Sequence, residues 1–245
     1  MKISLAIKNI RKNFAGIIAL DDLSMEFKKG SIIGIIGPNG SGKTTLANIL
    51  SGIITNDNGL FVFDEFFEVE KINPNETAFY KISRTFQDVR LFNQMSVLDN
   101  VLTVISEKSI FDSIFSKHID FHLKKTKKIL KETNLWGKRN CLAANLSYGQ
   151  KKLLEMARIM ASDTEIIIFD EIFSGLFPEM IGKIVDIIKR LKDEGKTVIV
   201  IEHNMKIIID LCDHVYVLDD GHLLAEGRPE KVLEEKKVLE AYLGK

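Results

Sequence analysis

The 245-residue sequence has only two cysteines, four prolines and no excess of charge of either sign. Cys141 and Cys212 form no C-x-x-C pair and have no histidine at metal-site spacing, which argues against a disulfide framework and against bound zinc. We expect two buried, free thiols in a reducing compartment. Lysine plus arginine and aspartate plus glutamate both number 34, so the formal net charge is zero. Nucleic-acid-binding proteins normally carry a basic surplus, so we expect no nucleic acid partner.

Long apolar runs are also missing. No run approaches the roughly 20 apolar residues that a helix needs to cross a bilayer, and the first residues contain no apolar core of signal-peptide length. The sequence therefore predicts a soluble protein, and any passage through a membrane would be formed by other chains. Hydrophobic residues nevertheless make up 45% of the sequence, which is enough for a large core.

Two kinds of apolar pattern predict an α/β fold. Alternating apolar residues in 3–7 and 23–27 predict strands with one buried face. Short apolar runs without alternation predict strands buried on both faces, as in a parallel sheet; they lie at 31–36, 165–169, 197–201 and 215–218. Helical patterns stand between these runs, at 44–51, 148–161 and 180–194. The alternation predicts a doubly wound α/β core.

The middle of the chain differs, because residues 96–145 contain no buried-strand run. Ser96, with Asp99 three residues later, predicts the start of a capped helix. Residues 119–134 predict a second amphipathic helix, whose apolar residues are Phe121, Leu123, Ile129 and Leu130. We interpret this region as a helical insertion. Near the end, residues 230–243 predict one terminal helix with Pro229 in its first turn.

One motif indicates phosphate binding. It fits G-x-x-x-x-G-K-S/T and consists of Gly37, Pro38, Asn39, Gly40, Ser41, Gly42, Lys43, Thr44 and Thr45. Glycines let backbone N–H groups surround an anion, and the N-terminus of the following helix favours negative charge. Lys43 adds a full charge for the outer phosphates, and the Thr44 hydroxyl can bind Mg²⁺. A Gly-rich turn that binds nothing is the alternative, but a buried strand before the motif and a helix after it favour phosphate.

Two acidic residues, Asp170 and Glu171, follow the apolar run at 166–169 and are also candidate site residues. The carboxyl end of a buried strand is where sites of open α/β sheets lie. Asp170 would hold Mg²⁺, and Glu171 would orient or deprotonate the attacking water. The alternative is a strand that ends in solvated acids, which is improbable beside an intact phosphate loop. No N-K-x-D sequence specifies guanine, so ATP is favoured over GTP.

Further motifs identify a family. The sequence Leu-Ser-Tyr-Gly-Gln at 146–150 stands just before a helix, and the chain resembles the nucleotide-binding subunit of an ABC transporter over its whole length. The other matching segments are 84–87, 170–171, 174–176 and 202–203. The resemblance implies an α/β ATP-binding core with N-terminal antiparallel strands in residues 1–92 and 163–226. It also implies an inserted helical subdomain in 93–162 and a C-terminal helical tail in 227–245.

The resemblance also implies residue roles. Phe14 would stack on adenine, and the less favoured alternative is a core aromatic. Gln87 would contact Mg²⁺ and the attacking water, with an ordinary surface amide as the alternative. His203 would contact the γ-phosphate and act in catalysis with Glu171 and Lys43, whereas a lone histidine is more often structural.

Ser147, Gly149 and Gln150 would contact the ATP held by a second ATPase subunit, in either a homodimer or a heterodimer. Two ATP molecules would then lie between two subunits. Integral membrane permeases would contact the Gln87 loop and the helical subdomain, which implies a peripheral location on the cytoplasmic face of the membrane. Two positions depart from the family pattern: Ile172 stands where proline is common, and Phe177 stands where aspartate or asparagine is common. An aromatic at 177 could pack across the interface or weaken polar communication there.

Several segments are similar to the larger ATPase subunit of branched-chain amino acid importers, namely 84–92, 146–160, 202–205, 225–229 and 241–244. The ATPase of lipopolysaccharide exporters shares part of this pattern. A soluble ABC ATPase that acts as a switch is a further alternative, although such proteins usually carry two cassettes or a long coiled coil.

Overall fold

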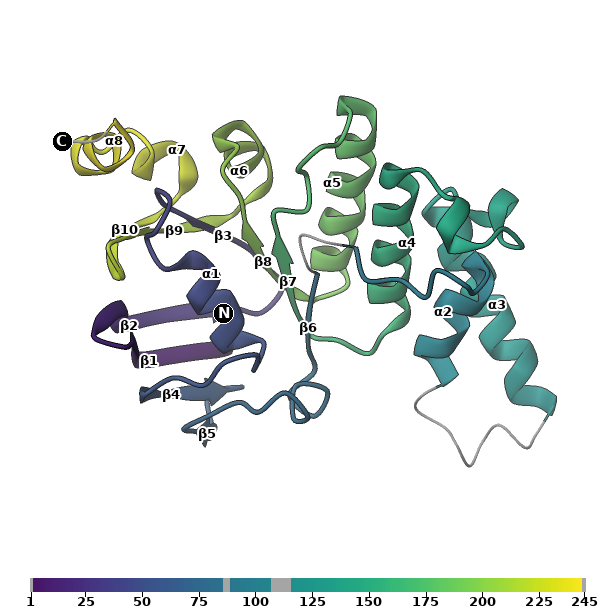
Figure 1. The fold of residues 1–245 in the computed structure, drawn as a ribbon, viewed down its shortest axis with the longest axis horizontal. Helices are drawn as coiled ribbons and strands as arrows, with labels where there is room; N and C mark the ends of the chain where they lie inside the picture. Colours follow the sequence, from purple (N-terminus) through teal and green to yellow (C-terminus); the bar gives the residue numbers. More distant parts are fainter. Residues whose placement is uncertain (1, 86–88, 107–115, 244–245) are drawn as a thin grey trace. The chain divides into compact units, whose positions relative to one another are not determined.

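The structure, a computed structural model, describes residues 2–85, 89–106 and 116–243 (Figure 1). The chain divides into two compact units. The first consists of Met1–Arg84, Thr164–Glu171 and Lys189–Lys245, and the second of Thr85–Asp163 and Ile172–Ile188.

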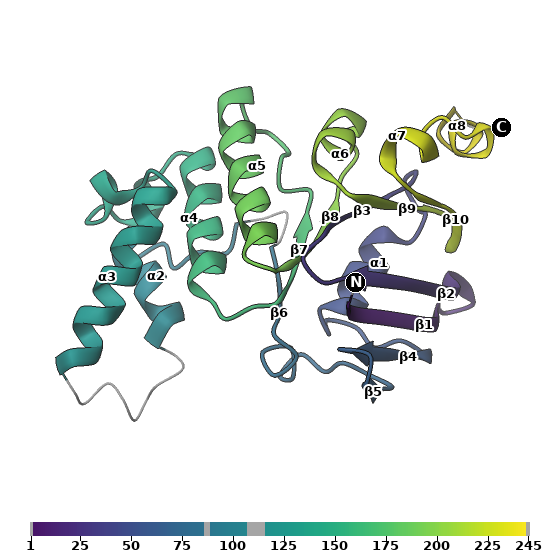
Figure 2. The same ribbon diagram turned by 180° about the vertical axis from the view of Figure 1, so that it is seen from behind.

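An antiparallel sheet in the first unit has the strand order β2-β1-β4-β5 (Figure 2). Its strands are β1 (Ile3–Phe14), β2 (Ile17–Lys28), β4 (Asn58–Phe63) and β5 (Phe67–Val69). The predicted alternation is confirmed in residues 23–27, where Leu23, Met25 and Phe27 are buried and the residues between them are exposed. It is wrong for residues 3–7, because Ser4 and Ala6 are buried as well as Leu5 and Ile7.

The second sheet of this unit has the order β10-β9-β3-β8-β7-β6 and is parallel except for β10. Its strands are β3 (Ile32–Ile36), β6 (Ile82–Arg84), β7 (Ile166–Asp170), β8 (Thr197–Ile201), β9 (His214–Asp219) and β10 (His222–Gly227). Every residue of β3, β7 and β8 is buried, as predicted for strands covered on both faces. Because these strands are parallel, the residues that follow them meet at one edge of the sheet.

Helix α1 (Lys43–Leu50) shares one buried core with strands of both sheets. Helix α6 (Met205–Leu211) packs on the opposite face of the parallel sheet (Figure 1). A Cβ on Gly34 of β3 would lie 3.3 Å from Ile208 of α6 and 2.9 Å from Val215, so glycine permits this close packing.

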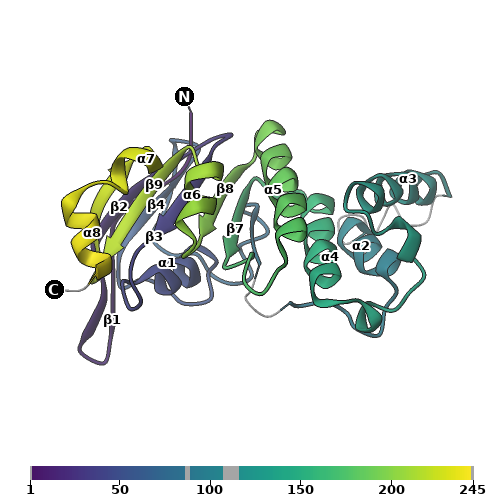
Figure 3. The same cartoon turned by 90° about the horizontal axis from the view of Figure 1, so that it is seen from above.

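The predicted single terminal helix is wrong. Residues 229–243 form two helices, α7 (Pro229–Val232) and α8 (Lys236–Leu243) (Figure 3). Both helices contact β10. Proline occupies the first turn of α7, as expected. Glu234 and Glu235 explain the break: negative charge is unfavourable after the C-terminus of α7 and favourable before the N-terminus of α8.

The second unit contains the helices of the insertion. They are α2 (Val97–Ser106), α3 (Ser116–Glu132), α4 (Tyr148–Ala161) and the 3-10 turns η2 (Trp136–Lys138) and η3 (Ala143–Asn145). Helix α5 (Pro178–Asp193) begins in this unit. The predicted cap of α2 is present, because Ser96 Oγ accepts a hydrogen bond of 3.0 Å from Asp99 N–H.

The predicted apolar face of α3 is only half correct. Ile129 and Leu130 are buried, whereas Phe121 and Leu123 are 63% and 39% exposed. Buried Thr126 lies one turn before Ile129 and Leu130, so the C-terminal part of α3 is buried, whereas residues 120–125 are exposed or half-buried.

Both cysteines are free, but only Cys212 is buried, which corrects the expectation for Cys141. Burial raises the pKa of the Cys212 thiol to about 12. Within the described ranges, no helix is both long enough and apolar enough to cross a bilayer.

Candidate functional site

The phosphate loop connects β3 to α1, and its glycines are required by its geometry. Gly37, Gly40 and Gly42 have φ values of 151°, 85° and 99°. A Cβ on Gly37 would lie 2.1 Å from the carbonyl oxygen of Leu218, and one on Gly42 would lie 2.7 Å from that of Ala19. The loop is therefore fixed between β9 and β2 and keeps its backbone close to any bound phosphate.

The side chains of the loop divide into buried and accessible ones. Ser41 is buried, Thr45 is half-buried, and Asn39 and Thr44 are exposed. The exposed Thr44 hydroxyl on the first turn of α1 is available to a metal ion or a phosphate.

Lys43 lies inside the loop, with only 6% of its surface exposed. Its ammonium donates hydrogen bonds of 2.8 Å to the carbonyl oxygens of both Gly37 and Pro38. Desolvation lowers the pKa of Lys43, and the nearby carboxylates of Glu171 and Asp170 oppose this shift. The structure thus brings the predicted lysine and both predicted acids together at the edge of the sheet.

Arg84 at the end of β6 pairs with Asp170 at the end of β7. Its Nη2 lies 2.6 Å from Asp170 Oδ2, and the two side chains are only 5% and 12% exposed. Its Nη1 donates to Asn48 Oδ1 at 2.7 Å and Ser51 Oγ at 3.0 Å, at the end of α1. Arg84 was not predicted as a site residue, because its only signal in the sequence is a basic side chain in the segment before Gln87.

Replacing Arg84 with methionine is expected to lower the free energy of unfolding by about 3–5 kcal/mol, because it leaves the buried Asp170 carboxylate without this cation. Urea denaturation measures the change. Lys8→Met is the matched control: Lys8 lies 3.6 Å from Glu68 with both side chains more than half exposed, so its loss should cost about 1 kcal/mol or less. Equal losses in the two variants would contradict the role of Arg84.

The residues present fit a magnesium ion bound together with phosphate. Within the described part of the chain, no group of three or more histidine, cysteine, aspartate or glutamate residues could hold a metal by itself. Thr44 and Asp170 supply oxygen atoms, which Mg²⁺ prefers, and an ion of this kind usually takes its other ligands from phosphates and water.

Glu171 and His203 pair with each other at the ends of β7 and β8. His203 Nε2 lies 2.8 Å from Glu171 Oε1, and the side chains are 44% and 29% exposed. Glu171 has a φ of 49°, and its N–H donates to Ile201 O at 3.0 Å. His203 N–H donates to the buried Glu202 carboxylate at 3.2 Å. Both side chains are therefore held in place by the ends of β7 and β8, within reach of water.

Phe14 ends β1 and is 44% exposed, so it is not a core aromatic. Lys12 Nζ lies 5.3 Å from its ring centroid, and the turn that follows has positive φ at Ala15 and Gly16. An exposed ring beside a tight turn is available to stack on a planar ligand. Gln87, predicted to contact Mg²⁺ and water, lies outside the described residues.

Ser147 caps α4 in the second unit. Its Oγ accepts from Gln150 N–H at 3.4 Å, and Gln150 Oε1 accepts from Ser147 N–H at 3.2 Å and from Lys138 Nζ at 3.0 Å. Gly149 packs on Met180, because an added Cβ would lie 3.0 Å from Met180 Cε. The result is an exposed helix N-terminus with the N–H groups that bind anions, in which the Gln150 side chain serves the cap.

The two unusual residues occupy contrasting environments in the second unit. Ile172 is completely buried, whereas Phe177 is 83% exposed. Residue 172 therefore packs like a core residue, and residue 177 presents an aromatic ring to solvent.

Comparisons with known proteins agree with this geometry. A family model described as ABC transporter matches residues 20–174. The probable branched-chain amino acid transport ATP-binding protein LivG of Archaeoglobus fulgidus is 37% identical over 254 residues, which cover 100% of this chain and 96% of that protein. The lipopolysaccharide export system ATP-binding protein LptB of Escherichia coli K12 is 30% identical over 241 residues, with 98% and 97% covered.

Solved structures show the same fold. The ATP-binding cassette MJ1267 of an ABC transporter, in its ADP conformation, has a TM-score of 0.85 and 35% identity, with all of both chains covered. The cassette MJ0796, solved as a dimer in a post-hydrolysis state with ADP and Pi, has a TM-score of 0.79 and 26% identity over 92% of this chain and 98% of that one.

These matches confirm the predicted α/β fold with antiparallel N-terminal strands and inserted helices. They extend over the phosphate loop, the acidic strand end and the cap of α4. The chain belongs to the ABC transporter family and is an ATP-binding cassette of the kind that hydrolyses ATP to drive transport.

Proposed function

We propose that two cassettes, either two copies of this chain or this chain and a similar one, bind two ATP molecules between them and hydrolyse them to power the import of branched-chain amino acids. The observation that carries the hydrolytic part is the Glu171–His203 pair at 2.8 Å, beside the lysine of the phosphate loop. The LivG relative, which matches over the whole chain, supports the cargo.

The residues divide the reaction between them. The loop N–H groups of residues 37–45 and the Lys43 ammonium bind the phosphates, and Thr44 and Asp170 hold Mg²⁺. This ion would neutralise charge on the phosphates as the bond to the leaving group breaks. Glu171 accepts the proton of the attacking water.

His203 orients the Glu171 carboxylate and contacts the γ-phosphate. Phe14 stacks on adenine, and Gln87 contacts the metal ion and the attacking water. The site needs no covalent intermediate, because phosphoryl transfer depends mainly on positioning and charge stabilisation.

The second anion site at the start of α4 supports the shared arrangement. Ser147, Gly149 and Gln150 lie on a helix N-terminus that is exposed and well capped. In the dimer, the Ser147 hydroxyl and the N–H groups at the start of α4 face the ATP held by the other cassette and bind its γ-phosphate. Closure of the dimer then depends on that phosphate, so hydrolysis is coupled to motion. The dimer reported for MJ0796 supports such an assembly.

Ser147→Arg is expected to leave ATP binding by a single cassette unchanged and to abolish ATP-dependent dimerisation, because the long cation blocks the exposed N-terminus of α4 and opposes its dipole. Light scattering after size-exclusion chromatography measures the dimer in a Glu171→Gln background. Asp186→Arg, on an exposed part of α5, is the control. An undiminished dimer in the Ser147→Arg variant would count against the shared site.

Permease subunits are the proposed partners. They would contact the Gln87 loop and the helical subdomain of residues 93–162, which places the protein at the cytoplasmic face of the membrane. Residues 1–92 and 163–226 then act as the ATP-binding core, with 227–245 as its tail. Co-purification with membrane subunits would support this arrangement over a soluble switch.

The relation to LptB favours one second candidate, the export of lipopolysaccharide. A strain that lacks only this chain separates the two functions. If the protein powers import, that strain should lose the uptake of labelled leucine and keep a normal amount of lipopolysaccharide at its surface. Loss of surface lipopolysaccharide with normal uptake would replace the import proposal by the export proposal.

A further inference from the structure

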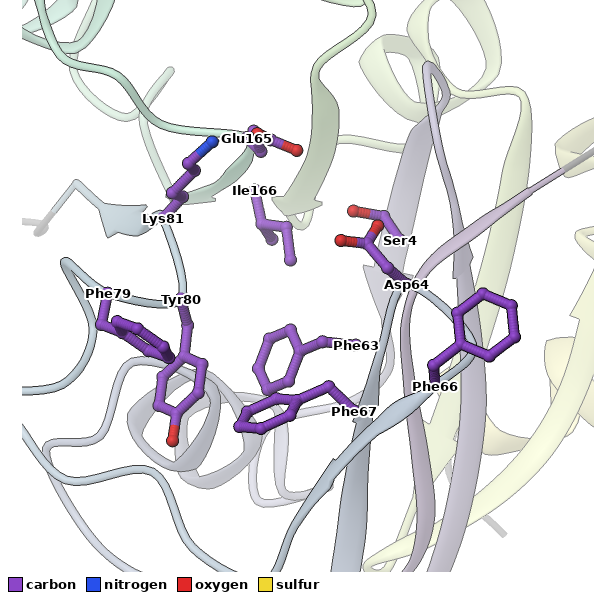
Figure 4. A pocket seen from close by; sticks show the side chains of 10 residues that line it. All are labelled: Ser4, Phe63, Asp64, Phe66, Phe67, Phe79, Tyr80, Lys81, Glu165 and Ile166. Atoms are coloured by element: carbon purple, nitrogen blue, oxygen red, sulfur yellow. Dashed lines mark hydrogen bonds and ion pairs between the residues drawn. The ribbon is translucent and has the colours of Figure 1, made fainter.

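A pocket of about 260 Å³ lies in the first unit, away from the ATP site (Figure 4). Its walls come from the start of β1, the β4–β5 turn, residues 79–81 and the residues that begin β7. Ile166 of the pocket begins β7, whereas Asp170 ends that strand at the proposed ATP site. The volume is below the range usual for drug-sized ligands, so a small molecule fits it.

Two oxygen acceptors point into this pocket, from Ser4 and Asp64 (Figure 4). Ser4 is only 4% exposed, yet its Oγ makes no hydrogen bond to any residue that the structure describes. The carboxylate of Asp64 likewise has no hydrogen bond or ion pair within the described ranges, although its backbone is bonded. Asp64 is exposed, so its carboxylate is solvated and accessible, and a ligand in the pocket can donate hydrogen bonds to both acceptors at once.

The backbone holds the two acceptors side by side. Asp64 N–H donates to Ser4 O at 3.1 Å, and Phe66 N–H closes the turn on Phe63 O at 3.1 Å. Asp64 and Glu65 have φ values of 48° and 70°, as in the tight turns of hairpins. Ile3 N–H fixes the turn further by donating to Glu65 Oε1 at 3.0 Å. The acceptors are therefore oriented before a ligand arrives.

Aromatic rings form another wall of the pocket. Phe63 and Tyr80 are stacked with centroids 4.7 Å apart, and Phe67 lies 6.1 Å from Tyr80. Phe79 closes the cluster and is 74% exposed. Such rings bind apolar groups, and their faces also attract cations.

The remaining charges of the pocket compensate each other. Glu165 pairs with Lys81 at 2.5 Å and with Lys29 at 3.3 Å. The hydrogen bond from Lys81 is the largest of the effects that lower the pKa of Glu165, so this carboxyl stays ionised and balanced by cations. The charge of Asp64 is the one left for a ligand.

We propose that this pocket binds a small primary ammonium compound with an apolar body. The ammonium donates hydrogen bonds to the Asp64 carboxylate and to Ser4 Oγ, and the body packs against Phe63, Phe67 and Tyr80. A primary ammonium matches the site because it has three donors and a positive charge. This site is independent of the proposed transport function.

Isothermal titration calorimetry of the whole chain tests this with three probes of one size: 2-phenylethylammonium, 2-phenylethanol and 3-phenylpropanoate. We expect the ammonium compound to bind about threefold to fivefold more tightly than the other two, as for an ion pair with an exposed carboxylate. Asp64→Asn should remove this preference. Ser4→Ala should lower the affinity for the ammonium compound about threefold or more.

Asparagine tolerates the positive φ of residue 64, so the Asp64→Asn variant should fold. Unchanged ATP binding by each variant verifies this, and Asp186→Asn on α5 is the matched control. The proposal is overturned if the alcohol or the carboxylate binds as tightly as the ammonium compound. It is also overturned if Asp64→Asn binds the ammonium compound as the unaltered chain does.

Discussion

Replacing Glu171 with glutamine is expected to slow ATP hydrolysis by about a hundredfold or more while ATP still binds, because general-base catalysis contributes roughly that much. Glutamine keeps the size of the side chain and its contact with His203, but it cannot accept a proton from water. ATP then persists in the site, so an ATP-bound dimer should accumulate. Phosphate release measures the rate, and light scattering measures the dimer.

Glu179→Gln is the matched control for this variant. Glu179 is an exposed glutamate that pairs with Lys183 on the surface of α5, so its replacement should leave hydrolysis unchanged. A Glu171→Gln variant that hydrolyses ATP at the normal rate and stays monomeric with ATP would show that another group is the base.

Replacing Lys43 with methionine is expected to weaken ATP binding by about tenfold to a hundredfold, which is the scale of hydrogen bonds to a charged group. The lysine is 6% exposed and already desolvated, so an anion restores a favourable environment for its charge. Methionine keeps the apolar part of the side chain and removes the ammonium. Titration with a fluorescent ATP analogue measures the affinity.

Lys237→Met provides the control, because Lys237 on α8 pairs with Glu235 and is about half exposed. The affinity of this variant should not change. Equal affinities in the Lys43→Met variant and the unaltered chain would refute the role of Lys43 in phosphate binding.

The central fold was predictable where the local pattern determined burial. Strands β3, β7 and β8 were found because apolar residues on both faces distinguish them from half-exposed strands. The residues proposed for the site stand at the carboxyl ends of these strands, namely the phosphate loop after β3, Asp170 and Glu171 at the end of β7, and His203 after β8. Parallel pairing alone brings their side chains to one edge, so the sequence predicted the grouping correctly.

Features that depend on distant contacts were not predictable. Strand β6 has three residues and exists through its pairing with β7. The Arg84–Asp170 pair joins residues that are 86 positions apart, and no local pattern indicates it. The Ser4–Asp64 acceptor pair likewise appears only when β1 meets the β4–β5 turn.

A photoreactive ATP that carries its reactive group on the γ-phosphate tests the shared site most directly. Two versions of the chain are mixed, both with Glu171→Gln, and one also carries Lys43→Met and a mass tag. The tagged chain then holds little ATP on its own loop. We predict that residues 147–150 of the tagged chain are labelled by ATP bound to the untagged one. Label found only on the untagged chain would contradict the account.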